Sequence, residues 1–385
     1  MSKRKMHAGL ALVILLLMAC GSFSLPLPTH TSTATPEFDA MTPAPAPADI
    51  IGSTDALSPL PIHVGYGVRG RWFEILFTDP SNPASAQATG GVDVRLVEAI
   101  NAARLSVHLA MYSLSLDDVR LALIRAHRRG IDVRLVSESD NMNANDFQRL
   151  KEAGIPVLGD RREGTMHDKF MVIDGQDVWT GSMNYTDSGA YMDNNTVVHI
   201  ESRDLAADYE AEFAEMFDDD KFGPEPGRLT PNPQVQAGGA QIHAFFAPDD
   251  APESALVDLL DTAQHSIYFL AYSFTSNPLG NAIKRAHADG ITVKGILDED
   301  QATSNLGTEF ASFRTAGLDV RLDGNRGQMH EKVFIIDGEV VVVGSYNFSR
   351  NANETNDENL LIIYDRTIAQ QYLLEFERVY AHSSR

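Results

Sequence analysis

The spacing of apolar residues predicts an alternation of helices and strands along the chain. Helical spacing over 92–104 precedes an apolar strand over 106–112, and a second helix from about Leu116 to Gly130 precedes a strand over 131–136. Strands that alternate with helices favour a mainly parallel sheet with helices on both faces. The pattern therefore predicts an α/β fold.

The same alternation occurs a second time. The segment 125–127, Arg-Ala-His, is followed by Gly130-Ile131, and it reappears as Arg-Ala-His at 285–287 followed by Gly290-Ile291. A repeat this long is a duplicated lobe and not a solenoid unit. We expect two lobes related by pseudo-two-fold symmetry, the first over 65–222 and the second over 241–385, joined by a linker over 223–240 that is rich in Gly, Pro and Asn.

The first twenty residues form a separate unit. Three basic residues at 3–5 precede an apolar run over 8–19, which is too short to span a bilayer and is typical of a secretory signal. Residues 17–20, Leu-Met-Ala-Cys, resemble the bacterial lipobox, in which the cysteine is lipidated and becomes the mature N-terminus. Cys20 is the only cysteine, so it forms no internal disulfide. The alternative is an ordinary signal peptide with an incidental cysteine.

A spacer and a strong negative charge complete the overall picture. Residues 21–64 are rich in Pro, Thr and Ala, and we expect them to be a disordered linker between the anchor and the catalytic body. The net charge is −22, and it becomes −25 once the basic residues at 3–5 are removed with the signal. Acidity of this size disfavours an extended nucleic-acid partner, although a local cationic pocket can still bind one phosphate. It also keeps an exported protein soluble.

One motif near the end of each copy carries the candidate chemistry. Both copies have the pattern His-x-Lys-(x)4-Asp-(x)6-Gly-Ser-x-Asn with the same spacing. A histidine and a lysine two residues apart on a strand point to the same face. Asp174-Gly175 and Asp337-Gly338 are hairpin-turn signals, so the returning strand brings the Ser and Asn of each copy back towards that face. The residues concerned are His167, Lys169, Ser182 and Asn184 in the first copy, and His330, Lys332, Ser345 and Asn347 in the second.

This double motif resembles the signature of the phospholipase D superfamily, and the resemblance covers both lobes. It implies a two-step reaction on a phosphodiester that needs no metal and no cofactor. One histidine attacks phosphorus to give a phosphohistidine, and the other protonates the leaving alcohol and then activates water. The two lysines and two asparagines would hold the non-bridging oxygens, with the two serines in support.

The copies differ downstream of the motif. Family members often carry a Glu that pairs with the second histidine, and Glu358 fits that position, whereas the first copy has Asp193-Asn194-Asn195. A carboxylate beside His330 would suit a general acid, and a neutral amide such as Asn194 would leave the other ring nucleophilic. We therefore expect His167 to be the nucleophile, with Asp193 as an alternative partner for it.

Other repeated polar residues have structural interpretations. Asp174 and Asp337 complete the signature, but a turn Asp more often caps backbone amides than it contacts substrate. His127 and His287 each end a predicted helix, where a histidine interacts with terminal carbonyl groups.

The sequence leaves three classes of enzyme open. An exported, membrane-anchored phospholipase D acting on glycerophospholipids is favoured, with both motifs in one chain and hence a monomer. The alternative is a nuclease similar to the small bacterial nucleases of the superfamily, and a phosphatidyltransferase similar to cardiolipin synthases is a third possibility.

Overall fold

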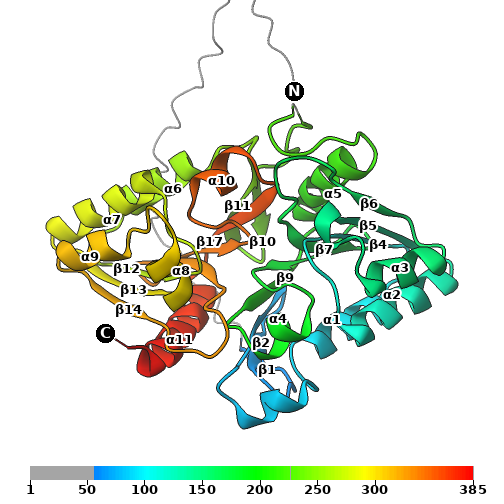
Figure 1. Ribbon diagram of the computed structural model, residues 1–385, viewed down its shortest axis with the longest axis horizontal. Helices are drawn as coiled ribbons and strands as arrows, with labels where there is room; N and C mark the ends of the chain where they lie inside the picture. The colour runs from blue at the N-terminus through cyan, green and yellow to red at the C-terminus, as the bar shows by residue number, and fades with distance from the viewer. Residues whose placement is uncertain (1–55, 226, 385) are drawn as a thin grey trace, which may run out of the picture. The chain divides into compact units, whose positions relative to one another are not determined.

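The computed structural model describes residues 56–225 and 227–384. The chain forms two lobes, each built on one β-sheet with helices on its faces (Figure 1). This confirms the predicted two-lobed α/β class. No helix among the described residues is both long enough and apolar enough to cross a membrane.

The first lobe contains a nine-stranded sheet in the order β1-β2-β3-β9-β8-β7-β4-β5-β6. Its strands are β1 Ser58–Pro59, β2 Tyr66–Arg69, β3 Phe73–Phe77, β4 Ser106–Met111, β5 Asp132–Ser137, β6 Val157–Gly159, β7 Lys169–Ile173, β8 Asp177–Gly181 and β9 Thr196–Glu201. Its helices are η1 Pro83–Gln87, α1 Asp93–Ala102, α2 Asp117–Arg128, η2 Ser139–Asn141, α3 Asn145–Glu152, α4 Asp187–Tyr191 and α5 Arg203–Phe217.

The second lobe repeats this order in an eight-stranded sheet, β10-β11-β17-β16-β15-β12-β13-β14. Its strands are β10 Gln234–Ala237, β11 Ala240–Ala247, β12 Ser266–Ala271, β13 Thr292–Leu297, β14 Asp319–Leu322, β15 Lys332–Ile336, β16 Val340–Gly344 and β17 Glu358–Tyr364. Its helices are α6 Pro252–Asp261, α7 Asn277–Ala288, α8 Glu299–Ser304, α9 Phe310–Thr315, α10 Arg350–Glu354 and α11 Arg366–His382.

The strand directions differ from the prediction. In the first lobe β4, β5 and β6 are parallel, as expected for strands joined by helices, but every other neighbouring pair is antiparallel. The expectation of a mainly parallel sheet is therefore wrong. The helix–strand alternation covers only part of each copy, and the remaining strands are joined by hairpins and returning connections, which give antiparallel pairs.

Alternating residues of the central strands supply two different cores. In β4, Val107 and Leu109 pack with α1 and α2 on the outer face, whereas Ala110 faces the core that contains α5. This second core also contains residues of α11 and β17, so it is shared by both lobes. The period of two along each strand thus divides the apolar residues between an outer core of one lobe and a common core between the lobes.

Two tight hairpins follow the motif strands. Asp174 and Gly175 have φ values of 55° and 61°, and Asp337 and Gly338 have 53° and 65°, the left-handed conformations that a two-residue hairpin turn requires. The Oδ1 atom of Asp174 accepts hydrogen bonds from the backbone N–H groups of Leu105 (2.7 Å) and Ser106 (3.0 Å), just before β4. Asp337 does the same before β12. The predicted amide-capping role of both aspartates is confirmed.

Both lobes begin earlier in the chain than predicted. Residues 58–59 pair with β2 and Val64 is fully buried, so the end of the expected disordered linker over 21–64 is part of the first lobe. The expected inter-lobe linker over 223–240 contains β10, which pairs with β11 in the second sheet. Residues 1–55, with the predicted signal, Cys20 and most of the spacer, lie outside the described part of the chain.

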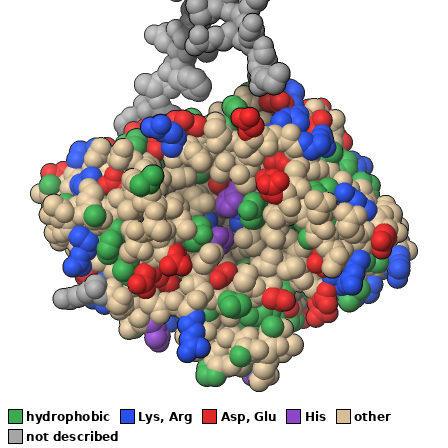
Figure 2. Space-filling model, in the orientation of Figure 1, with side chains coloured by type: hydrophobic (Ala, Val, Ile, Leu, Met, Phe, Trp, Pro, Cys, Tyr) green, Lys and Arg blue, Asp and Glu red, His purple; other side chains and the backbone are tan. Residues whose placement is uncertain are grey.

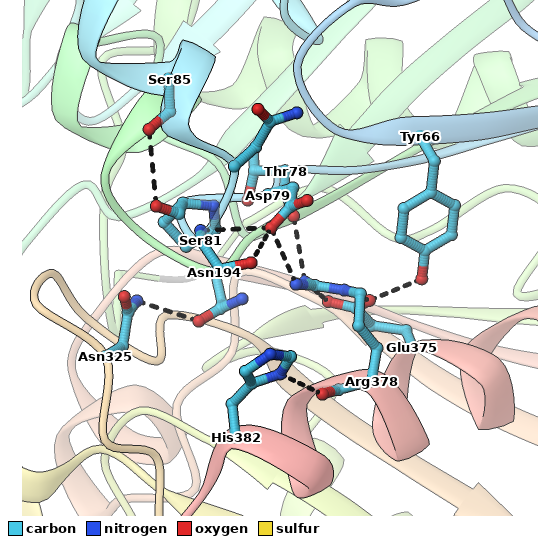
Figure 3. A network of polar contacts seen from close by, with 12 residues as sticks. Tyr66, Thr78, Asp79, Ser81, Ser85, Asn194, Asn325, Glu375, Arg378 and His382 are labelled. Carbon is cyan, nitrogen blue, oxygen red and sulfur yellow. Dashed lines mark hydrogen bonds and ion pairs between the residues drawn. The ribbon is translucent and has the colours of Figure 1, made fainter.

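A network of ion pairs and hydrogen bonds around Arg378 also joins the lobes. Arg378 on α11 donates to Glu375 on the same helix and reaches Asp79 (3.1 Å) and the carbonyl of Thr78 (3.1 Å) in the first lobe (Figure 3). Tyr66 on β2 donates to Glu375 at 2.5 Å. The helix that ends the second lobe is therefore fixed to β2 and to the segment that follows β3 in the first lobe.

Candidate active site

The two His-x-Lys pairs lie at the start of the central strands β7 and β15. Lys169 and Lys332 are the first residues of these strands, and each Nζ donates to the backbone carbonyl of the histidine two residues earlier, at 2.6 Å and 2.5 Å. Both lysines are buried. Each lysine is thereby held against the backbone of the histidine of its own motif.

Short reciprocal backbone contacts bring the two motifs together. The N–H of His167 donates to the carbonyl of Asp357 (3.0 Å), and the N–H of His330 donates to the carbonyl of Asn194 (2.9 Å). Each motif is thus paired with the segment before β17 or β9 of the opposite lobe. Such exchange of equivalent contacts is the pattern expected across a two-fold axis.

The histidine rings are held by side chains from the opposite lobe. Nδ1 of His167 lies 2.8 Å from Oε2 of Glu358, and Nδ1 of His330 lies 2.9 Å from Oδ1 of Asn195. The expected pairing of Glu358 with His330 is therefore wrong, because the carboxylate crosses to the other lobe. Each ring uses Nδ1 for this contact, which leaves Nε2 as the nitrogen available to a substrate.

The amide partner is Asn195, one residue later than expected. Asp193 accepts from the backbone N–H of Gln328 (2.9 Å), and the side chain of Asn194 accepts from Asn325 (2.9 Å; Figure 3). These two predicted partners of His167 therefore contact the loop before His330. A signal for Asn195 exists in the sequence, since it follows His167 at the same distance as Glu358 follows His330.

The motif serines support the histidine partners. Ser182 donates to Oδ1 of Asn195 (2.8 Å), and Ser345 donates to Oε2 of Glu358 (2.7 Å). Both serines are fully buried and also accept a backbone N–H. These bonds hold the two hydroxyl groups behind the histidines, so the serines support the site by positioning the partners of both rings. Asn184 and Asn347 are only half-buried, as phosphate donors at the surface of the site need to be.

Two tyrosines missed by sequence reasoning frame the site. The ring of Tyr112 meets His167 edge-on at 5.1 Å, and Tyr272 meets His330 in the same way at 4.8 Å. The ammonium groups of Lys169 and Lys332 lie 5.2 Å and 4.8 Å from the centres of these same rings. The repeat could have identified these two tyrosines, because they directly follow matching strands, β4 and β12.

Burial and like charge shape the electrostatics of the site. Burial, and then the nearby lysines, hold the pKa of both histidines well below the usual range. Burial lowers the pKa of Lys169 to about 8 and raises the pKa of Glu358 to about 8. Burial and then Lys169 lower the pKa of Lys332. An anionic substrate that enters between the two lysines would stabilise the charged form of both.

The centre is accessible from one face of the molecule. Figure 2 shows histidine atoms, with Lys or Arg atoms beside them, in a hollow near the middle of this face. The side chain of His167 is 13% exposed and His330 is 6% exposed. The site therefore combines a buried interior with a route by which substrate can enter.

Comparison with known proteins agrees with this arrangement. The family model described as "Cardiolipin synthase, PLD-like domain" matches residues 96–217 and again 256–380, more than half of the chain. The chain belongs to the phospholipase D superfamily. The superfamily membership that the double motif predicted is confirmed.

Individual relatives match about one lobe. The chain is 33% identical over 153 residues to a phospholipase D of Rickettsia bellii, covering 37% of this chain and 74% of that protein. It is 38% identical over 131 residues to the mitochondrial cardiolipin hydrolase of Xenopus tropicalis, covering 34% of this chain and 62% of the relative's length. The solved phosphatidylserine synthase of Haemophilus influenzae shares the fold over 76% of this chain and 84% of its own, with a TM-score of 0.58 and 15% identity.

Proposed function

We propose that this protein is a phospholipase D-type phosphodiesterase that hydrolyses glycerophospholipids to phosphatidic acid and a head-group alcohol. The observation that carries the proposal is the cross-lobe arrangement of His167 and His330. Each ring is fixed through Nδ1 by a residue of the other lobe, and each has a buried lysine beside it. Two oriented imidazoles with ammonium groups match the needs of phosphoryl transfer through a covalent intermediate.

In the proposed first step, Nε2 of His167 attacks phosphorus and a P–N bond forms. The P–O bond to the head-group alcohol breaks, and His330 gives its proton to the departing oxygen. In the second step, His330 takes a proton from water, the resulting hydroxide attacks phosphorus, and the P–N bond breaks. This releases phosphatidic acid and restores both rings.

The contact with Glu358 supports His167 as the nucleophile. A carboxylate at Nδ1 keeps the proton on that nitrogen, so the lone pair stays on Nε2, and it stabilises the positive ring of a phosphohistidine. His330 has only the neutral amide of Asn195 at Nδ1, which fixes the ring but does not stabilise its charged form, so the ring gives up its Nε2 proton more readily. The assignment made from the sequence is kept, but the reason for it is the opposite of the one expected.

The cations and amides of the site supply the charge stabilisation. Lys169 and Lys332, with the amide groups of Asn184 and Asn347, would hold the non-bridging oxygens as negative charge builds on them. Binding of the anionic diester would also raise the pKa of His330 towards the value that a general acid requires.

Two observations support a lipid substrate. The relatives that match include a phospholipase D and a mitochondrial cardiolipin hydrolase. The net charge of −22 repels polyanions. We also propose that Cys20 is lipidated after export, which would keep the monomeric catalytic body at a membrane surface of the cell envelope, outside the cytoplasm.

The experiment compares substrates directly. The full chain is incubated with vesicles of phosphatidylcholine or cardiolipin and, separately, with single-stranded and duplex DNA, and a His167→Asn variant serves as the control. We expect phosphatidic acid from vesicles, intact DNA, and no product with the variant. Cleavage of DNA without lipid hydrolysis would replace the proposal with a nuclease.

A further inference from the structure

A small polar groove lies beside the catalytic centre in the second lobe. It has a volume of about 260 Å³, and its walls include Ser273, Asn305, Ser349 and Arg350. Sites for drug-sized ligands occupy roughly 300–1,000 Å³. The groove is therefore suited to a small polar group and not to an acyl chain.

A chain of side chains connects the groove to His330. The ring of Tyr272 contacts His330, and its hydroxyl accepts a hydrogen bond from Gln301 at 3.2 Å. Gln301 in turn accepts from Asn305 (2.5 Å), and the same amide of Asn305 reaches Ser273 (3.4 Å) in the groove wall. Tyr272, Gln301 and Asn305 thus link the groove to the histidine that protonates the leaving alcohol in the proposed reaction.

The direction of displacement assigns the groove to one end of the substrate. The attacking and leaving atoms in phosphoryl transfer lie on opposite sides of phosphorus, roughly in line. If His167 of the first lobe attacks, the leaving alcohol departs towards the second lobe. It therefore departs towards His330 and the groove.

Charge differs sharply between the two lobes at this position. Arg350 is the first residue of α10, and its counterpart at the start of α4 in the first lobe is Asp187. Among the described residues that line the groove, Arg350 alone carries a charge. Its ion pair with Glu354 is long, at 3.9 Å, and the arginine side chain is 80% exposed, so the guanidinium is available to a ligand.

We propose that this groove binds the leaving alcohol of the diester and that Arg350 selects an alcohol carrying its own phosphate. A guanidinium binds phosphate through paired hydrogen bonds, and the serine and asparagine side chains can bind hydroxyl groups. The groove offers no carboxylate for a cationic head group such as choline. This inference rests on the proposed function and specifies its head-group preference.

The test uses three monomeric short-chain phospholipids that differ in the charge of the leaving alcohol. These are phosphatidylglycerophosphate (anionic), phosphatidylglycerol (neutral) and phosphatidylcholine (cationic), and kcat/KM is measured for each with the full chain. We expect the wild type to prefer the anionic alcohol. Arg350→Glu should lower the ratio of anionic to cationic turnover about tenfold, the size expected for one charge-assisted contact.

Two matched variants separate the groove from general charge effects. Arg350→Lys keeps the charge and should retain most of the ratio, and Asp187→Ala, at the equivalent position of the first lobe, should leave the ratio unchanged. An Arg350→Glu ratio equal to that of the wild type would overturn the inference while the proposed function stands. Absence of hydrolysis of all three lipids by the wild type would overturn both.

Discussion

Oδ1 of Asn195 lies 2.9 Å from Nδ1 of His330, at the position where the carboxylate of Glu358 meets His167 in the other half of the site. The two lobes thus exchange equivalent side chains, but one of them is charged and the other is neutral. This single difference breaks the symmetry of the site and gives its two histidines different chemistry.

Replacing Glu358 with Gln should remove most of the activity without unfolding the protein. Gln can still accept the hydrogen bond from Ser345, but it no longer stabilises a positive ring on His167. We expect kcat to fall about 100-fold or more, as when a carboxylate that orients a catalytic histidine becomes an amide. Steady-state rates on a soluble diester measure the effect. Asn195→Asp is the matched control, and it should keep activity within about tenfold; equal losses in the two variants would refute the asymmetry.

The activity should depend on pH in a bell-shaped manner with a maximum near pH 8. The pKa of Lys169 is lowered to about 8, so its positive charge is lost as the pH rises through that value. The pKa of Glu358 is raised to about 8, so its negative charge is lost as the pH falls. The pH profile of kcat/KM reports both limbs for the free enzyme. The two apparent pKa values that it gives belong to the coupled groups together. Lys169→Arg should shift the alkaline limb upward, and an unmoved limb would assign it to another group.

The sequence allowed the elements to be predicted better than the contacts. The helix over 92–104 and the strand over 106–112 correspond to α1 and β4, because apolar spacing reports which face of an element is buried. The partner of each histidine was predicted wrongly for a physical reason. Spacing along the chain assigns Glu358 to its own copy, whereas the pseudo-two-fold axis places it against the other. The sequence did not predict that most strand pairs are antiparallel. The direction of a pair depends on how the chain returns from one strand to the next, and apolar spacing does not report this.

Asp174 should matter for stability and not for chemistry. Its carboxylate accepts the backbone N–H groups of Leu105 and Ser106, and its own φ is 55°. Asp174→Ala should lower the free energy of unfolding by about 2 kcal/mol, since it leaves those amides without an acceptor and puts Ala, which cannot make the local hydrogen bonds that help Asp adopt it, in the left-handed region. Urea denaturation measures this change. Asp174→Asn should retain most of the stability that Asp174→Ala loses. A large loss of kcat with unchanged stability would point instead to a catalytic role.

Arg378 should contribute more to stability than most residues near the surface. It is the cation beside Glu375, whose side chain is fully buried. Arg378→Ala leaves that carboxylate without its partner, and breaking such a buried pair costs about 3 kcal/mol or more. Tyr66→Phe removes only one hydrogen bond to Glu375 and should cost about 1 kcal/mol. Equal melting temperatures for the wild type and Arg378→Ala would show that Arg378 does not contribute to stability through these contacts.

The most direct test of the account is the site of the covalent intermediate. The His330→Asn variant lacks the acid and base but keeps His167 and Glu358, so a lipid with a good leaving group should phosphorylate it without rapid hydrolysis. Mass spectrometry of the denatured protein, kept at alkaline pH, should find the phosphatidyl adduct on the peptide that contains His167. An adduct on His330 in the reciprocal His167→Asn variant, with none on His167 in His330→Asn, would contradict the assignment.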